Sequence, residues 1–332
     1  MASNSPALDT RSPSASTLAT WLRGNAREWV PFAVLVLLVL AVGLAEPSFL
    51  RPRSLGTVVK VAAPLIILAI GQMFPILTGG IDLTQAVLAS LGTVLLALFL
   101  PHLGIIGVIA MLILITAAGA LSGTVAVVAQ IPTFIVTLGG MTVWAAVSMV
   151  ASGSTTIPIG DGHQFLAWMN IPVVGVITVA SVLAISIAFF AAYLIRTMTR
   201  GRAFHLLGLG EGAARLAGVR TARVRIAAFA ISGFTAGLAA MMLSAAQHSG
   251  SPTLANELLL PVIASVVLGG TAITGGVGGP VRALVGALTI AVLRVGLGIA
   301  GVNPAFEQII YGAAIVVAVI FTLDRARLKI VK

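Results

Sequence analysis

The segment from Ile105 to Val128, IIGVIAMLILITAAGALSGTVAVV, decides the fold class of this chain. It carries no charged residue and is apolar on every side, and about 20 such residues in a helix cross the hydrocarbon core of a bilayer. Inside hydrocarbon every backbone N–H and C=O needs an internal partner, so only helices and closed barrels span it. A barrel strand would alternate apolar and polar residues over roughly ten positions, and this segment does not. The segment therefore predicts a transmembrane helix.

The composition of the 332 residues extends this prediction to most of the chain. Hydrophobic residues make up 59% and charged residues 8%, whereas a soluble domain has about 25% charged residues. Between Val61 and Ile195 the only formal charges are Asp82 and Asp161. The expected fold class is all-α, a polytopic bundle of transmembrane helices. The net charge of +10 does not indicate nucleic-acid binding, because Lys and Arg flank apolar runs without interleaved aromatic residues.

Ten apolar segments are long enough to span a membrane when short, broken helices are allowed. They are Val30–Ala45, Val58–Leu77, Ala86–Leu100, Gly104–Val128, Thr133–Ala151, Pro172–Ile195, Ile226–Gln247, Glu257–Gly270, Val281–Ala300 and Ala305–Leu323. The first run also resembles the apolar core of a signal peptide, but the many spans after it favour an uncleaved helix. We therefore expect about ten spans, with helices broken by glycine and proline.

Basic residues orient the bundle, because cytoplasmic loops carry an excess of Lys and Arg. The loop 196–225 has seven arginines and a single acid, Glu211, and the chain ends in a basic segment, so both should be cytoplasmic. The predicted organisation is a disordered cytoplasmic tail over 1–29, a transmembrane domain over 30–323 that contains this loop, and a basic cytoplasmic tail over 324–332. Arg51, Arg53 and Lys60 argue against this orientation, since they fall on the outer side.

Two glycine-rich polar stretches interrupt the spans, Thr78–Gln85 and Gly269–Pro280. Short, glycine-broken segments in comparable positions of two halves are typical of a transport site, where unwound backbone supplies polar groups at membrane depth. Glycine pairs also allow close helix packing or tight turns, and this reading stays open. Pro64 and Pro75 add potential breaks within the second span, and Pro132 is interpreted as a helix start.

Several polar residues within these apolar surroundings are candidates for the solute pathway or its gate. Asp82 is either a cap for the third span or part of the pathway. Arg294 lies deep in the ninth span, where it must snorkel to the interface, contact a polar solute or pair with Glu307. Gln72 is interpreted first as a polar link between helices. The complete candidate set is Gln72, Asp82, Thr84, Gln85, Thr137, Thr271 and Arg294.

The sequence predicts a transport protein and no enzyme. There is no cysteine, and the four histidines, His102, His163, His205 and His248, fall in separate loops, so we expect no metal site and no bound cofactor. No nucleophile with a base in reach can be identified, and a G-x-x-x-x-G-K-[ST] phosphate loop is absent from the sequence. If nucleotide hydrolysis drives this protein, another chain performs it.

Four short motifs, in order, resemble one family. They are Gly79-Gly80-Ile81-Asp82-Leu83-Thr84, Ile131–Gly139, Gly201-Arg202 followed by Gly208–Gly218, and Val267–Thr271 with Gly275-Gly276. Over about Val58 to Leu323 the chain resembles the permeases of bacterial ABC importers of the ribose, xylose and galactose class, a family that also includes branched-chain amino-acid permeases. The acid in the first motif resembles the sugar permeases more. Gln85-Ala86 and Arg294 depart from the family pattern, which leaves the solute open. Gly212 stands at a position that is usually acidic in the family, which leaves open which ATPase the chain docks on.

The resemblance implies a set of partners and a location. Such permeases form a two-permease core, with a second copy or a paralogue, in the bacterial inner membrane. Two cytoplasmic ATPase subunits bind ATP and Mg²⁺, and a periplasmic binding protein delivers the solute, here a small polar molecule such as a monosaccharide or polyol. The stretch matching the family's ATPase-coupling element contributes Glu211, Ala213, Ala214, Arg215, Leu216 and Gly218.

The residues of this stretch also support a coupling role independently. One helical face carries Ala213, Leu216 and Ala217. The side chains small enough to seat closely on a partner are Ala213, Ala214 and Ala217. Gly218 suits the position after a helix end. An amphipathic basic loop resting on anionic lipid is the alternative.

For the whole chain the competing functions are a secondary transporter driven by an ion gradient, a branched-chain amino-acid permease, and an assembly subunit without transport. A secondary transporter is expected to carry paired carboxylates within the membrane, and Asp82 is almost alone there.

Overall fold

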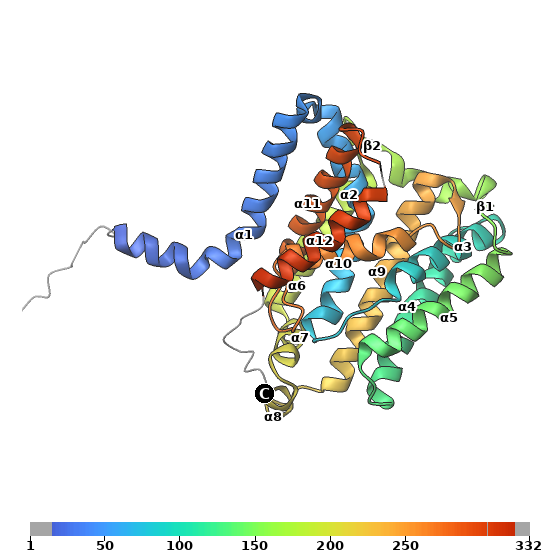
Figure 1. The fold of residues 1–332 in the computed structure, drawn as a ribbon. Helices are drawn as coiled ribbons and strands as arrows, with labels where there is room; N and C mark the ends of the chain where they lie inside the picture. Colours follow the sequence, from blue (N-terminus) through green and yellow to red (C-terminus); the bar gives the residue numbers. More distant parts are fainter. Residues whose placement is uncertain (1–14, 304, 323–332) are drawn as a thin grey trace, which may run out of the picture.

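A computed structural model of the chain describes residues 15–303 and 305–322 as a helical bundle with two very short sheets (Figure 1). The α-helices are α1 (Ala15–Ala45), α2 (Pro52–Leu77), α3 (Gln85–Leu103), α4 (Ile105–Val128), α5 (Thr133–Ser152), α6 (Val179–Thr197), α7 (Thr199–Leu209), α8 (Glu211–Leu216), α9 (Thr221–Gln247), α10 (Leu259–Leu268), α11 (Pro280–Ile299) and α12 (Ala305–Thr322). Short 3-10 helices lie at Pro47–Leu50, Gly160–Phe165, Ala167–Asn170 and Asn256–Leu258. The strands are β1 (Ile157–Pro158), β2 (Pro172–Val174), β3 (Ile177–Thr178) and β4 (Ser249–Gly250), paired antiparallel as β1–β4 and β2–β3.

Seven of these helices are long and apolar enough to cross a membrane, namely α2, α3, α4, α5, α6, α9 and α11. Each coincides with a predicted span. The other three predicted spans correspond to shorter apolar helical segments, Trp29–Ala45, Asn256–Leu268 and Ala305–Val316. The predicted all-α, multi-span class is therefore confirmed, whereas ten crossings are not, because seven of the described helices meet the length and apolar composition of a span.

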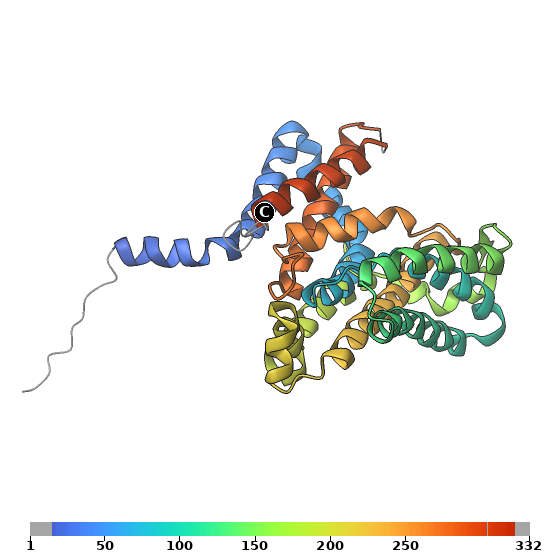
Figure 2. The same cartoon turned by 60° about the horizontal axis from the view of Figure 1, so that its bottom comes forward.

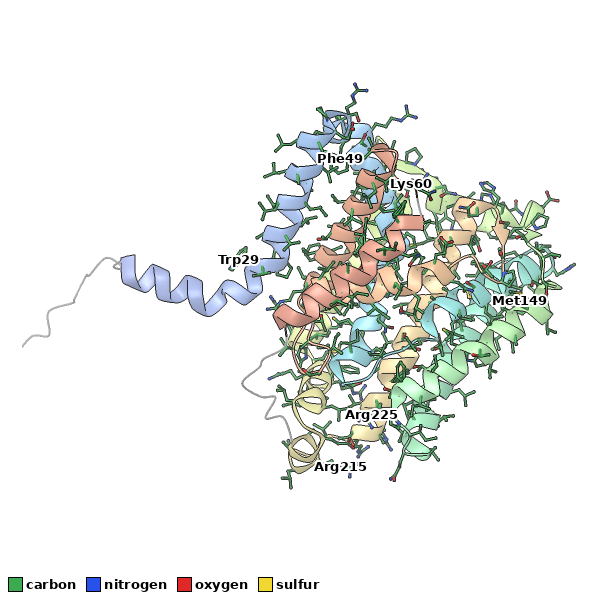
Figure 3. The ribbon with its side chains drawn as sticks, viewed as in Figure 1. Trp29, Phe49, Lys60, Met149, Arg215 and Arg225 are labelled. Carbon is green, nitrogen blue, oxygen red and sulfur yellow. The ribbon has the colours of Figure 1, made fainter. Side chains whose placement is uncertain are left out.

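Two boundaries differ from the sequence prediction. The sixth span was expected from Pro172, but α6 begins at Val179, because Gly175 adopts a positive φ of 58° and turns β2 back onto β3. The helix α1 begins at Ala15 and therefore overlaps residues 15–29, for which the composition predicts disorder. It contains Pro31 and bends close to Trp29 (Figures 1 and 3), as expected where proline removes a backbone hydrogen bond. Residues 1–14, about half of the first predicted tail, and residues 323–332, which include the whole second tail, lie outside the described ranges.

The helices α2 and α9 form the centre of the bundle. The helix α9 packs on α2, α3 and α4, and α2 also packs on α6 and α11. Small residues bring the backbones together, since a Cβ on Gly119 of α4 would lie 2.9 Å from Cα of Gly233 in α9. The helix α5 lies at the rim (Figure 2), with most of its apolar side chains exposed. This arrangement buries the middle of α2 and the start of α3, where the sequence candidates cluster.

Pro132 and the prolines of α2 behave differently. Pro132 immediately precedes α5, which begins at Thr133, so its interpretation as a helix start is confirmed. Pro64 and Pro75 lie within the continuous helix α2. The Thr78 hydroxyl donates a 2.8 Å hydrogen bond to the carbonyl of Pro75 at the end of that helix, and the glycine-rich break begins there. Proline therefore does not break the second span, whereas glycine ends it.

Candidate translocation and coupling site

The two glycine-rich breaks, far apart in sequence, lie against each other. The amide of Gly276 donates a 2.9 Å hydrogen bond to the carbonyl of Leu77, the last residue of α2. Gly79, Gly275 and Gly276 all have positive φ angles, of 78°, 90° and 77°, which only glycine adopts readily. These glycines therefore make tight turns and close backbone contacts, and the two breaks form one junction.

The helix α7 closes this junction from one side. A Cβ on Gly208 would lie 1.9 Å from the carbonyl oxygen of Leu77 and 2.2 Å from the amide nitrogen of Gly276. His205, one turn earlier, makes a 3.2 Å hydrogen bond to the carbonyl of Gly278. The basic loop 196–225 is therefore in direct backbone contact with both breaks. Sequence reasoning placed Gly208 in a family motif but missed this contact, because no local pattern indicates which distant backbone a glycine approaches.

Asp82 holds the turn that leads into α3. Its Oδ1 accepts hydrogen bonds from the backbone N–H of Thr84, at 2.9 Å, and from the Thr84 hydroxyl, at 2.5 Å. Thr84 itself is the N-cap residue of α3, so Asp82 forms a turn before the helix and does not cap its first N–H groups. The hydroxyl of Thr137 in α5 donates to the carbonyl of Ile81 at 3.1 Å. The first break is thus tied to α3 and α5.

Several buried polar atoms near these breaks lack a hydrogen-bond partner among the described residues. They are Oδ2 of Asp82, both amide atoms of Gln72, Oγ1 of Thr271 and Oγ of Ser232 in α9. The Ser232 hydroxyl lies beside the Asp82 carboxylate, within reach of a long hydrogen bond to it, and sequence reasoning missed it because serine is common in such helices. Unsatisfied polar atoms are costly in a buried site, so these atoms retain unused hydrogen-bonding capacity beside the breaks.

Gln85, and not Gln72, links the helices. Its Nε2 donates to the carbonyl of Leu68 in α2 at 3.0 Å and to the hydroxyl of Thr235 in α9 at 3.2 Å. Gly71 makes room for this link, since a Cβ there would lie 1.8 Å from Oγ1 of Thr235. The expected linking role of Gln72 is therefore wrong for the described residues. The reason is helix rotation, which aims Gln85 at α2 and α9 and leaves the amide of Gln72 without a partner.

Arg294 stands apart from the other candidates. Its Nε lies 3.5 Å from Oε2 of Glu307 in α12, which also accepts a 3.0 Å hydrogen bond from the Tyr311 hydroxyl. Its side chain is 43% exposed, whereas that of Glu307 is 15% exposed. Arg294 follows Pro280 by 14 positions in α11, which corresponds to about 21 Å along a helix. The structure thus brings Asp82, Thr84 and Thr137 together at the first break and leaves Arg294 in an ion pair with Glu307.

The predicted coupling stretch folds as the short helix α8, Glu211–Leu216. Glu211 accepts hydrogen bonds from Arg215, at 2.6 Å, and from Arg225 of α9, at 3.1 Å. The bond from Arg215 and the nearby charge of Arg225 hold the pKa of Glu211 below its usual value of 4.5. The amides of Gly218 and Val219 donate to the carbonyls of Arg215 and Ala214, which confirms Gly218 as the residue after the helix end.

The exposure of one residue of α8 differs from the prediction. Ala214 is only 1% exposed and faces the protein interior, so it does not belong to the surface expected to seat on a partner. Ala213 and Ala217 are exposed, and Leu216 is 93% exposed, an unusual position for a large apolar side chain in a polar loop. Because Ala214 is enclosed, a bulky replacement there would disturb the packing of this chain itself.

A cavity of about 600 Å³ joins the first break to α8. Its walls include Gly80 and Ile81, Thr133 at the start of α5, and the charged groups of Glu211, Arg215 and Arg225. Figure 3 shows Arg215 and Arg225 toward one end of the molecule and Lys60 toward the other. Within residues 15–303 and 305–322, no three His, Cys, Asp or Glu side chains come close enough to hold a metal ion.

Comparisons with known proteins agree with one another. The ribose import permease protein of Bacillus subtilis is 31% identical over 301 residues, 90% of this chain and 92% of the relative. A probable ABC transporter permease protein of Sinorhizobium fredii is 31% identical over 295 residues, covering 88% and 87%. The fructose import permease protein of Rhizobium meliloti is 29% identical over 305 residues, covering 87% and 83%. Residues 54–319 match the family described as branched-chain amino acid transport system / permease component. With its multi-span helical bundle, this chain therefore belongs to that family of membrane transport permeases.

Proposed function

We propose that this chain is the membrane-spanning permease subunit of an ATP-driven importer for a monosaccharide or a similar polyol. The observation that carries the proposal is the similarity to ribose and fructose import permeases over most of the chain. Transport requires a periplasmic binding protein to deliver the solute, a second copy or a paralogue to complete the core, and two cytoplasmic ATPase subunits that hold ATP and Mg²⁺. The chain itself needs no cofactor.

The proposed topology is ten crossings in the bacterial inner membrane with both termini cytoplasmic. The three short apolar segments, α10 among them, would cross as broken or tilted helices packed within the bundle. Figure 3 shows Lys60 toward the opposite end of the molecule from Arg215 and Arg225, which fits the odd number of crossings that this topology places between them.

The proposed solute pathway or gate passes the junction of the two breaks. Unpartnered polar atoms of Gln72, Asp82 and Thr271 support it, and the cavity beside Ile81 has a volume of about 600 Å³, large enough for a monosaccharide. In this scheme Thr84, Thr137 and Gln85 position the break, and Arg294 acts outside it. The helix α8 then forms the coupling element, with Leu216 exposed toward the ATPase and Glu211 holding the helix on α9 through Arg225.

The other candidate functions receive less support. Among the described residues, Asp82 is the one carboxylate that is fully buried, so a paired acid relay for ion-driven transport has no second member. The family description includes branched-chain amino-acid transport, but two of the three named relatives are ribose and fructose import permeases.

Reconstitution with the ATPase subunits and the binding protein tests the proposed function. Proteoliposomes should accumulate radiolabelled ribose or fructose only when ATP is supplied, and an imposed sodium or proton gradient without ATP should give no uptake. Uptake driven by the gradient alone would support a secondary transporter. ATP-dependent uptake of leucine but of neither sugar would support an amino-acid permease.

A further inference from the structure

A second cavity, of about 370 Å³, opens where α6, α7 and the start of α11 meet. Four basic or ionisable side chains line it, Arg196 at the end of α6, Arg202 and His205 on α7, and Arg282 in α11. No aspartate or glutamate is part of its wall. The residues come from three separate helices, so the tertiary structure, and not a local basic run, gathers the positive charge.

Two features of this cavity fit an anion. Arg196 and Arg202 are both exposed, and the described residues offer neither of them an acidic partner, whereas Arg282 is already engaged in an interaction of its own. The helix α11 also begins at the wall, and its first N–H groups have no partner within the helix. A helix start carries partial positive charge and donates hydrogen bonds to phosphate groups.

The third feature is the surface that leads into the cavity. Phe189, Ala192, Tyr193 and Arg196 share one face of α6 by their helical spacing. Phe189 is 56% exposed and Tyr193 is 63% exposed, so this face is apolar until it reaches the arginine at the end of the span. In a membrane-spanning helix such a face contacts lipid chains, and tyrosine favours the level of the headgroups. The basic cavity therefore lies where a lipid headgroup meets the protein.

We propose that this cavity, bounded by Arg196, Arg202 and His205, binds the phosphate headgroup of an anionic phospholipid, whose acyl chains lie along the Phe189–Tyr193 face of α6. The planar guanidinium groups donate paired hydrogen bonds to phosphate oxygens, and the Nε2–H of His205 is already directed to the Gly278 carbonyl and orients the ring. The site requires a membrane-spanning chain but no particular solute, so its test is independent of the transport proposal.

Lipid binding to the purified full-length chain tests this site. Short-chain phosphatidylglycerol is titrated and the complexes are resolved by native mass spectrometry, with phosphatidylcholine as the zwitterionic comparison. The variant Arg196→Gln with Arg202→Gln should bind the first phosphatidylglycerol roughly 25-fold more weakly, since each basic group contributes about a factor of five. The matched control is Arg200→Gln with Arg223→Gln, which removes two exposed arginines of the same loop outside the cavity. Its affinity should stay within about twofold of the wild-type value.

Replacement of both cavity arginines by lysine keeps the charge and should retain part of the affinity, because lysine lacks the fork geometry. Equal loss in the cavity variant and in the matched control would overturn the proposal in favour of general attraction to the basic loop. Equal affinity for phosphatidylglycerol and phosphatidylcholine would also overturn it. Displacement of the lipid by millimolar inorganic phosphate would indicate a site for a free anion and would contradict a lipid site.

Discussion

Asp82 presents two carboxylate oxygens in different surroundings. Oδ1 accepts two hydrogen bonds from Thr84, and Oδ2 has no described partner. Asp82→Ala should lower the free energy of unfolding by about 2–3 kcal/mol, because it leaves the Thr84 donors unpaired in a buried site. Asp82→Asn keeps the acceptor and should cost less than about 1 kcal/mol. Thermal unfolding of the purified variants measures this difference, with Thr84→Val as the control that removes only the hydroxyl donor.

The same pair of variants separates shape from charge in transport. Since Asp82→Asn retains the turn, a fall in uptake at normal abundance would assign a pathway or gating role to the charge. Normal uptake by both Asp82→Asn and Asp82→Ala would contradict that role. That result would also argue against a structural requirement for the turn, because the Asp82→Ala variant cannot form the turn.

At the scale of the element, the exposed side chain of Leu216 on α8 allows a test of coupling to the ATPase. Leu216→Asp should change the stability of the permease by less than about 0.5 kcal/mol, since Leu216 is 93% exposed. If Leu216 seats in a groove on the ATPase, its replacement by a charge should weaken ATPase binding roughly tenfold or more and lower solute-stimulated ATP hydrolysis. Co-purification of the ATPase subunit and the ATPase rate of the reconstituted complex measure this effect.

Val174→Asp is the matched control for this prediction. Val174 is also an exposed apolar residue, 68% accessible, but it lies in the short hairpin β2–β3, away from α8 (Figure 1). It should leave co-purification of the ATPase unchanged. If Leu216→Asp also leaves both co-purification and coupled hydrolysis at the wild-type level, α8 rests on lipid and the coupling assignment is wrong.

At the scale of the whole molecule, Gly208 connects the basic loop to the end of α2 and to the second glycine-rich break. Gly208→Ala should lower the free energy of unfolding by about 1–3 kcal/mol and reduce uptake, because its Cβ would overlap the backbone of Leu77 and Gly276. Gly212→Ala is the matched control, since no atom lies within 4 Å of a Cβ there. It should be neutral or stabilise the protein by up to about 1 kcal/mol, because alanine is the better helix former.

Thermal unfolding and uptake at matched abundance measure both glycine variants. A Gly208→Ala protein as stable and as active as Gly212→Ala would show that the junction is loosely packed. The contact of α7 with the breaks would then not couple movement of the basic loop to the helices of the bundle.

The sequence by itself determined that the chain lies in a membrane and where most of its helices run. Long apolar segments such as Ile105–Val128 leave the backbone only one way to satisfy its hydrogen bonds in lipid, and that requirement is local to each segment. Family motifs likewise indicated the permease class, and Gly218 indicated the end of α8. The hairpin before α6 was missed because the β-branched residues of 172–178 are also apolar, and hydropathy alone does not separate such a strand from a helix.

Only the tertiary structure decided which residues meet. Gln72 and Gln85 look equivalent in sequence, yet rotation of their helices gives Gln85 its partners in α2 and α9 and leaves Gln72 with none among the described residues. Ala214 and Leu216 are two positions apart, and the packing of α8 buries the first and exposes the second. The contact of Gly276 with Leu77 joins residues almost 200 positions apart. Such pairings depend on the angles and rotations at which helices pack. Close backbone contacts at small residues set these angles, and no local sequence pattern encodes them.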